Sequence, residues 1–344
     1  MTELIRPSEI LTEPEPFYEI HTDWCYGAVH RRGGKPYAGD LIDIATFSSS
    51  VIPDDPFRFQ IGFIADGATM IKPFNEIPDE VKSIFKCVRN GKEYFLPDVY
   101  WAAVFKSITT GFKAMSNMEL VEQFPEEFFQ NGVLDYANEL GFELWRSLFD
   151  YSWPRTLSVN ERPEEIFAKE LYGGLQVAVG KVLLRAFPLL IISNRATYPS
   201  GIASVIVRGK SEAMLGFGSA TSGDISVCTT VKKFALLNDP SIVDEHDRLR
   251  VLLGGNQEDW ATYRATFIGN MQGFDEKYTL SKQPSGQYFL SMTAFTDGFR
   301  IPGEEIEQAA LLNSDPQRAL KRVIDHKHSV KARGDDASHI EMHW

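Results

Sequence analysis

The hydrophobic pattern of this chain changes its period along the sequence, and these changes limit the folds that it can adopt. Phe57–Asp66 places an apolar residue at every second position, as a half-buried strand does, and runs into the turn dipeptide Asp66-Gly67. Between about residues 98 and 187 the apolar residues recur with helical spacing instead. After residue 200 the strand pattern returns. The chain therefore alternates between blocks of strands and blocks of helices.

Two long amphipathic helices are predicted in the middle block. Asp98 is a plausible cap for the first, and Pro163 precedes the second. Their apolar positions are Trp101, Val104, Phe105, Ile108, Phe112 and Met115 in the first helix, and Phe167, Leu171, Leu175, Val179, Val182 and Ala186 in the second. Between them, residues 119–153 are aromatic and helix-prone, and they form either extra helices in the same layer or a small cap.

Strands are predicted again in the last third of the chain. Ile202–Val207 and Ala213–Phe217 flank a short turn and predict an antiparallel hairpin, and Tyr288–Thr296 is a further strand. A helical segment from Glu304 to about His328 restarts at a proline, and Ala337–Trp344 is a final strand. This order predicts an α+β fold in which helices cover antiparallel sheets.

The composition excludes several classes of partner. The 344 residues include 47 Asp and Glu against 35 Lys and Arg, which gives a net charge of −12. Nucleic acids and anionic membrane surfaces both require clustered positive charge, so neither is expected as a partner. The most apolar stretch, residues 182–193, is interrupted by an arginine and a proline and is shorter than the roughly 20 residues of a membrane span. We expect a cytoplasmic protein with no export signal and with reduced, unpaired cysteines.

Acidic residues recur at three predicted strand ends or turns, a fourth lies upstream, and each of the four has a glycine beside it. The four are Asp40, Asp66, Asp297 and Asp335. If these ends converge, the carboxylates repel one another in a low-dielectric site unless a cation neutralises them. Ligation by oxygen alone suits magnesium or manganese rather than zinc. An adjacent glycine lets the chain turn sharply and offer a carbonyl as a further ligand.

The ordered set of motifs resembles the metal-dependent type 2C serine/threonine phosphatases, which include bacterial members. The segments that carry the resemblance span nearly the whole chain in the order of the family. They are HRRGGKPYAGD (residues 30–40), FIADGA (63–68), SGIASVIV with EAMLGFGS (200–219), FTDGF (295–299) and GDDASHIEMHW (334–344).

This resemblance implies a four-layer fold, an antiparallel β-sandwich flanked by helix pairs, over a single phosphatase-like domain at residues 1–344. Residues 119–160 would be an enlarged helical insertion or cap within it. Two Mg²⁺ or Mn²⁺ ions would lie between the sheets. Asp66 would bridge both ions and the Gly67 carbonyl would bind one, while Asp297 and Asp335 would hold the other. Asp40 would contact a metal directly or through water.

The resemblance also implies the reaction. A metal-activated water would hydrolyse phosphoserine or phosphothreonine of a phosphorylated protein, with Asp66 and Asp297 at the catalytic centre. Arg32 or Arg31 would hold the phosphate, and Lys35 is a third possibility for that role.

The chain departs from the family at several positions, and these departures keep other functions open. Ala68 stands where the family has His or Met, Ser219 stands where it has Asp, and Asp336 replaces an Asn. One alternative is a catalytically impaired phosphatase-fold module that binds a phosphoprotein or a partner protein. Another is a hydrolase that acts on a small phosphorylated metabolite at the same metal centre.

The last strand carries a second group of polar residues. His339, Glu341 and His343 alternate with apolar neighbours and therefore share one face. Two histidines and a glutamate could bind a metal, but any half-buried strand shows such an alternation. We therefore expect a solvated face here.

Overall fold

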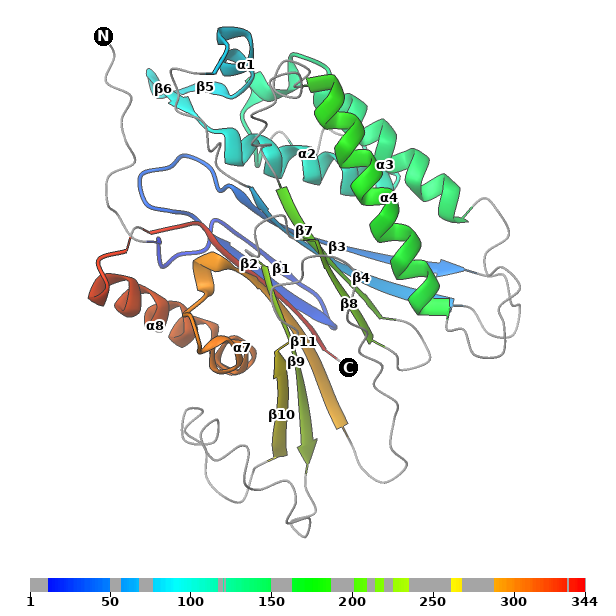
Figure 1. The fold of residues 1–344 in the computed structure, drawn as a ribbon, viewed down its shortest axis with the longest axis vertical. Coiled ribbons are helices and arrows are strands. Elements are labelled where there is room, and N and C mark those ends of the chain that lie inside the picture. The colour runs from blue at the N-terminus through cyan, green and yellow to red at the C-terminus, as the bar shows by residue number, and fades with distance from the viewer. Residues whose placement is uncertain are drawn as a thin grey trace.

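The structure is a computed structural model, and it describes the greater part of the chain (Figure 1). The described residues are 12–49, 57–67, 77–116, 120, 122–149, 163–186, 201–208, 214–219, 225–234, 261–267, 288–332 and 334–343.

Two antiparallel sheets form the centre of the described structure. The larger has the strand order β1-β2-β12-β11-β9-β10, and the smaller has the order β3-β4-β7-β8. The strands of the larger sheet are β1 (Tyr18–His21), β2 (Cys25–His30), β9 (Ile225–Phe234), β10 (Ala261–Phe267), β11 (Tyr288–Thr296) and β12 (Ala337–His343). Those of the smaller sheet are β3 (Asp40–Ser49), β4 (Phe57–Gly67), β7 (Gly201–Arg208) and β8 (Met214–Ser219). A separate hairpin pairs β5 (Lys86–Arg89) with β6 (Lys92–Phe95).

Small residues let the two sheets approach each other. A Cβ atom on Gly62 of β4 would lie 3.0 Å from Sδ of Met342 and 3.1 Å from Cδ1 of Ile340, both on β12. On the other side of the contact, a Cβ on Gly27 of β2 would lie 2.8 Å from Cδ1 of Ile42 on β3. The faces between the sheets are therefore apolar and closely packed.

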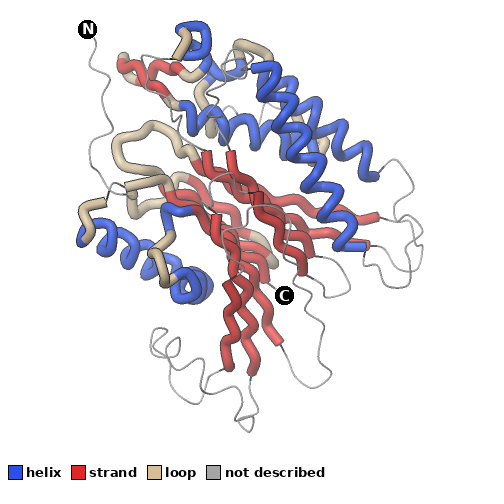
Figure 2. Tube along the Cα trace, viewed as in Figure 1, coloured by secondary structure: helices blue, strands red, loops and turns tan. Residues whose placement is uncertain are grey.

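Helices lie on both sides of this pair of sheets, as Figures 1 and 2 show. On the side of the smaller sheet are α2 (Pro97–Phe112), α3 (Val133–Phe149) and α4 (Pro163–Ala186). On the side of the larger sheet are α7 (Glu305–Ser314) and α8 (Pro316–Ser329). The short helix α1 (Asp79–Ile84) and the 3₁₀ turns η3 (Glu126–Phe129) and η6 (Asp297–Phe299) complete the described elements. The predicted combination of helices with antiparallel sheets is confirmed.

Helix α2 is predicted to be amphipathic, with one buried face, but nearly all of its residues are buried. It lies between the smaller sheet and α3, and two glycines allow the close contact with α3. A Cβ on Gly111 would lie 1.9 Å from the Asn138 carbonyl oxygen, and one on Gly141 would lie 2.0 Å from that of Ile108. The helix begins at Pro97, so Asp98 lies in its first turn and is not its cap.

Several other predicted elements are confirmed. Strand β4 and helix α4 occupy the predicted residues, β7 and β8 form the antiparallel hairpin, and the C-terminal helical segment divides at Asp315. The side chain of Asp315 caps α8 by accepting a hydrogen bond from the Arg318 amide at 3.0 Å. Residues 119–153 contribute η3 and α3. The sequence analysis did not identify β1, β2, β3, β9 and β10.

The sequence predicts unpaired cysteines and no membrane-spanning helix, and the structure bears on both expectations. Cys25 and Cys87 are free and buried, while the side chain of Cys228 lies outside the described part. Among the helices that the structure describes, none combines the length and the apolar character needed to cross a membrane.

Candidate active site

Asp40 and Asp66 are brought together by the pairing of two neighbouring strands. Asp40 opens β3 and Asp66 is the penultimate residue of β4, and the antiparallel register places them directly opposite each other. Asp40 is 4% exposed, whereas Asp66 is half-buried. The pairing of β3 with β4 thus places Asp66, at the end of β4, beside Asp40.

Asp297 and Asp335 come from the other sheet. Strand β11 ends at Thr296, immediately before Asp297, and β12 begins at Ala337, two residues after Asp335. Because β11 and β12 are antiparallel neighbours, the end of one lies beside the start of the other. The hydroxyl of Thr296 donates to Oδ2 of Asp40 at 2.6 Å, so these ends meet the start of β3.

Three other carboxylates act on the ionisation of Asp40. Burial raises the pKa of Asp40 well above its ordinary value, and the negative charges of Asp336, Asp335 and Asp297 raise it further. The hydrogen bond from Thr296 acts in the opposite direction. Burial and the charge of Asp336 likewise raise the pKa of Asp335. The charges of Asp297, Asp335 and Asp336 therefore reach Asp40.

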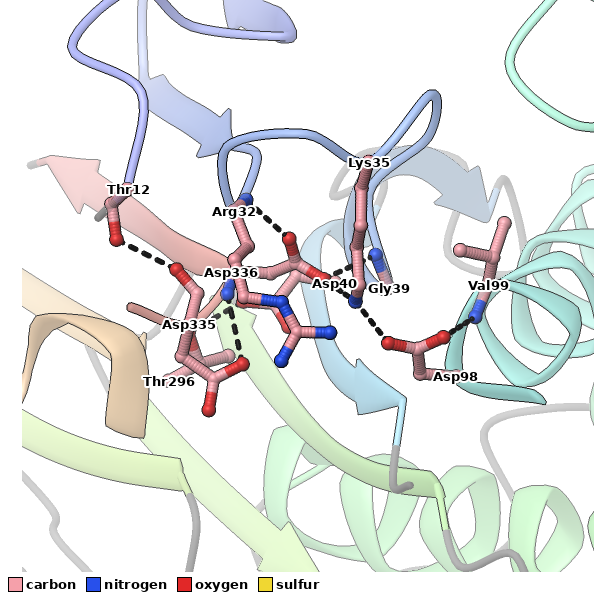
Figure 3. Close-up of polar contacts among 10 residues, drawn as sticks. All are labelled: Thr12, Arg32, Lys35, Gly39, Asp40, Asp98, Val99, Thr296, Asp335 and Asp336. Carbon is pink, nitrogen blue, oxygen red and sulfur yellow. Dashed lines mark hydrogen bonds and ion pairs between the residues drawn. The ribbon is translucent and has the colours of Figure 1, made fainter. Parts of the chain in front are cut away.

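Asp336 is held by three donors. Its carboxylate accepts hydrogen bonds from the Arg32 amide at 2.6 Å, from the Gly39 amide at 2.8 Å and from Nζ of Lys35 at 2.9 Å. Burial by itself would raise the pKa of Asp336, but Lys35 and the donated hydrogen bonds together lower it. Asp336 is therefore an ionised acceptor that ties the 31–39 loop to the start of β12 (Figure 3).

Lys35 lies inside the cluster and bridges two carboxylates. Its ammonium pairs with Asp336 and with Asp98 of α2, and the residue is only 6% exposed. Burial would lower the pKa of Lys35, but the charges of Asp336 and Asp98 raise it. An ammonium that is buried and bound to two carboxylates is not available to hold a phosphate. Of the three predicted phosphate-binding cations, Lys35 is therefore unsuited to that role.

The two arginines differ in their contacts. Arg31 pairs with Glu13 at 2.6 Å and donates to the Pro36 carbonyl at 3.2 Å. Figure 3 shows the Arg32 side chain directed into the space bordered by Asp335, Asp336 and Lys35. Within the described residues, Nε of Arg32 is buried without a hydrogen-bond partner. A buried guanidinium donor of this kind suits an anion that arrives with a ligand.

The backbone around Gly67 is closely packed. The Gly67 amide donates to the Gly39 carbonyl at 3.0 Å, and a Cβ on Gly67 would lie 2.2 Å from the Asp98 carbonyl oxygen. Position 67 therefore requires glycine for reasons of packing alone. On the far side of the cluster, the Thr12 hydroxyl donates to the Asp335 carbonyl at 2.7 Å.

The chemistry of these donors is that which a hard divalent cation prefers, because carboxylates from strand ends of both sheets lie near one another and Asp40 is buried beside the negative charges of Asp336, Asp335 and Asp297. Over the part of the chain that is described, however, no three Asp, Glu, His or Cys residues are grouped so that they could hold an ion between them. The structure thus brings the predicted acids into one region without forming a closed cage of ligands.

Two residues of this region, Asp98 and Thr296, are not assigned to it by the sequence, which indicates only a helix cap and a strand end. Lys35 is assigned to it, as one possible phosphate-binding residue, but its ion pairs with Asp98 and Asp336 are not. Lys35 and Asp98 are 63 positions apart, and Lys35 and Asp336 are 301 apart. No local spacing signals contacts of this kind. The altered residue Ala68 lies outside the described residues.

The prediction of a solvated face on β12 is wrong for His339 and Glu341, which are 0% and 3% exposed. The His339 ring lies 5.2 Å from Phe299 and 5.4 Å from Tyr26, measured between ring centroids. Burial lowers the pKa of His339 to about 3 and raises that of Glu341 to about 8. The reason is that α7 packs on this face, which the alternation of β12 alone could not show. The side chain of His343 lies outside the described part.

Comparisons with known proteins give only distant matches. No protein-family model and no curated protein matches the chain. Among solved structures, a serine-threonine phosphatase 2C from Toxoplasma gondii is 9% identical, with 97% of this chain and 98% of that chain covered and a TM-score of 0.41. RsbX in complex with magnesium is 10% identical, with coverages of 95% and 98% and a TM-score of 0.31.

A PPM Ser-Thr phosphatase from Mycobacterium smegmatis in complex with cacodylate is 12% identical. The match covers 94% of this chain and 99% of that chain, with a TM-score of 0.32. Similarity at this level carries no argument about activity, metal or substrate, so the function must be judged from the residues of the site.

Proposed function

We propose that this chain is a metal-dependent phosphatase of the type 2C class that hydrolyses phosphoserine and phosphothreonine in proteins. The observation that carries the proposal is that Asp40, Asp66, Asp297 and Asp335 lie at strand ends of two sheets that meet there, beside Nε of Arg32, which has no hydrogen-bond partner among the described residues. The four-layer sandwich, the single domain over residues 1–344 and the insertion at 119–160 belong to this proposal, as does a cytoplasmic location without nucleic-acid or membrane partners.

Within this proposal, Mg²⁺ or Mn²⁺ would be held by the carboxylates of Asp66, Asp297 and Asp335 and by the Gly67 carbonyl. The bound metal would supply an activated water and stabilise charge that develops on the phosphoryl group. Asp40 borders this region, and the Thr296 hydroxyl fixes its carboxylate. Asp40 is thus oriented before any ligand arrives, which lowers the cost of organising the site.

Arg32 has the properties of a phosphate-binding residue. Its guanidinium offers paired donors that match two phosphate oxygens, and its Nε lacks a partner among the described residues. The backbone amide of Arg32 is fixed by Asp336 at 2.6 Å, which limits where the side chain can reach. Arg32 would orient the phosphoryl group, whereas Arg31, paired with Glu13, would not.

A specific observation also favours the alternative, a phosphatase-fold module that binds a phosphoprotein without turnover. No cage of three donors is formed by the described residues, and Asp336 is neutralised by Lys35 instead of being open to a metal. In such a module Arg32 would still bind a phosphate. Protein substrates are preferred to small phosphorylated metabolites on the family resemblance alone.

The test is hydrolysis of para-nitrophenyl phosphate and of a phosphothreonine peptide, with Mn²⁺, with Mg²⁺ and with chelator. Asp66→Asn and Asp297→Asn are expected to abolish metal-dependent turnover, and Arg32→Met is expected to raise KM more than it lowers kcat. Asp79→Asn is a matched control, because the Asp79 side chain is 93% exposed on α1 and its change should leave turnover intact.

Three outcomes separate the functions. Metal-dependent turnover that both aspartate variants lose supports the hydrolase. Peptide binding without turnover by folded protein supports the binding module. Turnover of small phosphate esters with no activity on phosphopeptides favours a metabolite substrate.

A further inference from the structure

Helix α8 and the residues just beyond it concentrate positive charge in a chain that is acidic as a whole. Residues 316–331 contain five Lys and Arg against a single acid, whereas the whole chain has a net charge of −12. The five cations are Arg318, Lys321, Arg322, Lys327 and Lys331. Because a cluster of one sign attracts groups of the opposite sign, this helix would draw an acidic partner.

The packing of α8 leaves most of this charge on the surface. The helix lies on the outer side of the larger sheet (Figure 1). Its buried residues are Ala319, Leu320 and Val323. Arg318 and Lys321 are exposed, and so is Lys331 just beyond the end of the helix. The apolar side thus holds α8 to the fold, while the charged side faces solvent.

Most of these cations have no carboxylate partner among the described residues. Of the five, only Arg322 forms an ion pair there, with Glu304 at the start of α7. On the β5–β6 hairpin, by contrast, Lys86 pairs with Glu93 at 2.6 Å. A carboxylate that approaches an unpaired cation does not have to displace an existing partner, so the surface of α8 is ready to bind one.

The basic helix ends beside the candidate active site. Lys331 precedes Asp335 by four positions. Burial and the charge of Asp336 raise the pKa of Asp335, and the positive charges of Lys327 and Arg32 act in the opposite direction. Lys327 and Arg32 therefore lie near the same carboxyl group, although they come from different elements. A phosphoprotein whose phosphate reaches Arg32 would have a neighbouring segment within reach of α8.

The size of this surface suits a polypeptide better than a nucleic acid. From Arg318 to Lys327 the helix rises about 14 Å at roughly 1.5 Å per residue, a length that about four residues of an extended peptide cover. A nucleic-acid site that neutralises about six to ten phosphates needs more cations than α8 presents. The negative net charge of the whole chain would also repel a long polyanion.

We propose that the basic surface of α8, formed by Arg318, Lys321, Lys327 and Lys331, binds an acidic segment of the phosphoprotein whose phosphate binds at Arg32. This inference rests on the phosphoprotein binding in the proposed function. It adds a preference for phosphoproteins that carry acidic residues a short distance from the phosphorylated residue. It depends neither on a metal nor on turnover.

The experiment measures binding of fluorescein-labelled phosphothreonine peptides to the full chain by fluorescence anisotropy, in chelator. In one pair of peptides, four Glu or four Gln follow the phosphothreonine after a short spacer, and in a second pair they precede it. In at least one pair, the Glu peptide is expected to bind about tenfold more tightly at low salt, and this ratio should approach one at about 0.5 M salt. Equal affinities in both pairs, or no binding of any peptide, would overturn the inference.

Arg318→Gln/Lys321→Gln tests whether α8 is responsible for the preference. Both side chains are exposed and Gln is a good helix former, so the variant should fold and lose most of the preference for Glu. Lys181→Gln/Arg185→Gln is the matched control, because it removes one Lys and one Arg from the exposed surface of α4, on the side of the smaller sheet. Lys331→Gln, outside the helix, is a second variant that should lose part of the preference even if the double variant does not fold.

Three results with these proteins would contradict the inference. The first is a preference for Glu that the folded α8 variants keep. The second is an equal loss of the preference in the α4 control, which would indicate an effect of net charge alone. The third is a single-stranded oligonucleotide that binds more tightly than the Glu peptide and loses its binding in the α8 variants, which would overturn the choice of a polypeptide partner.

Turnover of the same peptides with Mn²⁺ separates this inference from the proposed hydrolase. A preference for Glu in binding without any hydrolysis retains the inference and removes the phosphatase. Hydrolysis without the preference does the reverse.

Discussion

The hydroxyl of Thr296 donates a hydrogen bond to the carboxylate of Asp40 at 2.6 Å, and so joins the end of β11 in one sheet to the start of β3 in the other. The Ser338 amide donates to the same hydroxyl at 3.0 Å, which fixes the orientation of the hydroxyl group. A small polar contact thus aligns the strand ends that carry the acidic residues.

Thr296→Val removes this donor and keeps the shape of the side chain. Because a hydrogen bond to a charged group contributes roughly 1.5 to 3 kcal/mol, we expect a loss of that size in the free energy of unfolding. Since the hydroxyl lowers the pKa of Asp40, the loss should grow with pH as Asp40 ionises. Urea denaturation in chelator at several pH values measures it. Thr46→Val, at an exposed position on β3, should change stability by less than about 0.5 kcal/mol.

Asp40→Asn should stabilise the metal-free protein at high pH. The pKa of Asp40 is raised in the folded state, so its contribution to stability is complete below the ordinary value of 3.8 and is lost as the pH rises through the folded pKa. The variant should match the parent near pH 4 and exceed it at pH 8 by on the order of 1 to 3 kcal/mol, measured by urea denaturation in chelator.

Asp43→Asn serves as a control, because it should change the free energy of unfolding in the direction opposite to Asp40→Asn. Burial would raise the pKa of Asp43, but Lys106, Lys113 and Thr109 lower it overall. Its stabilising contribution is therefore present at neutral pH and is lost as the pH falls through the folded pKa. This variant should be less stable than the parent at pH 8, and the difference in the free energy of unfolding should become smaller as the pH is lowered. If Asp40→Asn and Asp43→Asn changed the free energy of unfolding at pH 8 in the same direction, the opposite pKa shifts of the two carboxyl groups would be refuted.

Glu341→Gln should also stabilise the protein, in a defined pH window. Burial raises the pKa of Glu341 from 4.5 to about 8, so the parent loses stability as the pH rises between these values. The variant avoids this loss, and its advantage should grow from nearly zero at pH 4.5 to roughly 2 to 5 kcal/mol at pH 8. Thermal unfolding of the variant and the parent, measured between pH 4.5 and pH 8, shows how the difference in stability depends on pH. Glu93→Gln, on the exposed hairpin, should show no such trend.

A double-mutant cycle on Lys35 and Asp336 measures the ion pair within the site. Lys35→Met leaves two buried carboxylates without a cation and should cost roughly 3 to 5 kcal/mol. In the Lys35→Met/Asp336→Asn double variant, one of those charges is absent, so the combined cost should fall short of the sum by about 0.5 to 3 kcal/mol. Additive costs in urea denaturation would show that the pair is not coupled.

Two glycine substitutions test the helical layer. Gly141→Ala would place a Cβ 2.0 Å from the Ile108 carbonyl oxygen and force α3 away from α2, at a cost of about 3 kcal/mol or more. Gly180→Ala, in α4, meets no atom within 4 Å and should raise stability by about 0.5 to 1 kcal/mol. The two changes should therefore shift the urea midpoint in opposite directions.

Local sequence patterns locate the long helices and the strands β4, β7, β8, β11 and β12, and they mark the strand ends that carry an acid. The alternation before Asp66, the helical spacing after Pro163 and the proline restart at Pro316 all depend on neighbours within a few positions, which local patterns record. The convergence of Asp40 with Asp66 also follows from such patterns, once β3 is recognised as the partner of β4.

Which faces are covered and which charges meet depends on the packing of elements that lie far apart in the sequence. The alternation of β12 shows that His339 and Glu341 share a face, but the packing of α7 determines that this face is buried. Lys35, Asp98 and Asp336 carry no local signal, because their contacts join residues 63 and 301 positions apart. Burial and charge pairing depend on distances through space, and chain folding sets these distances between residues that the sequence keeps apart.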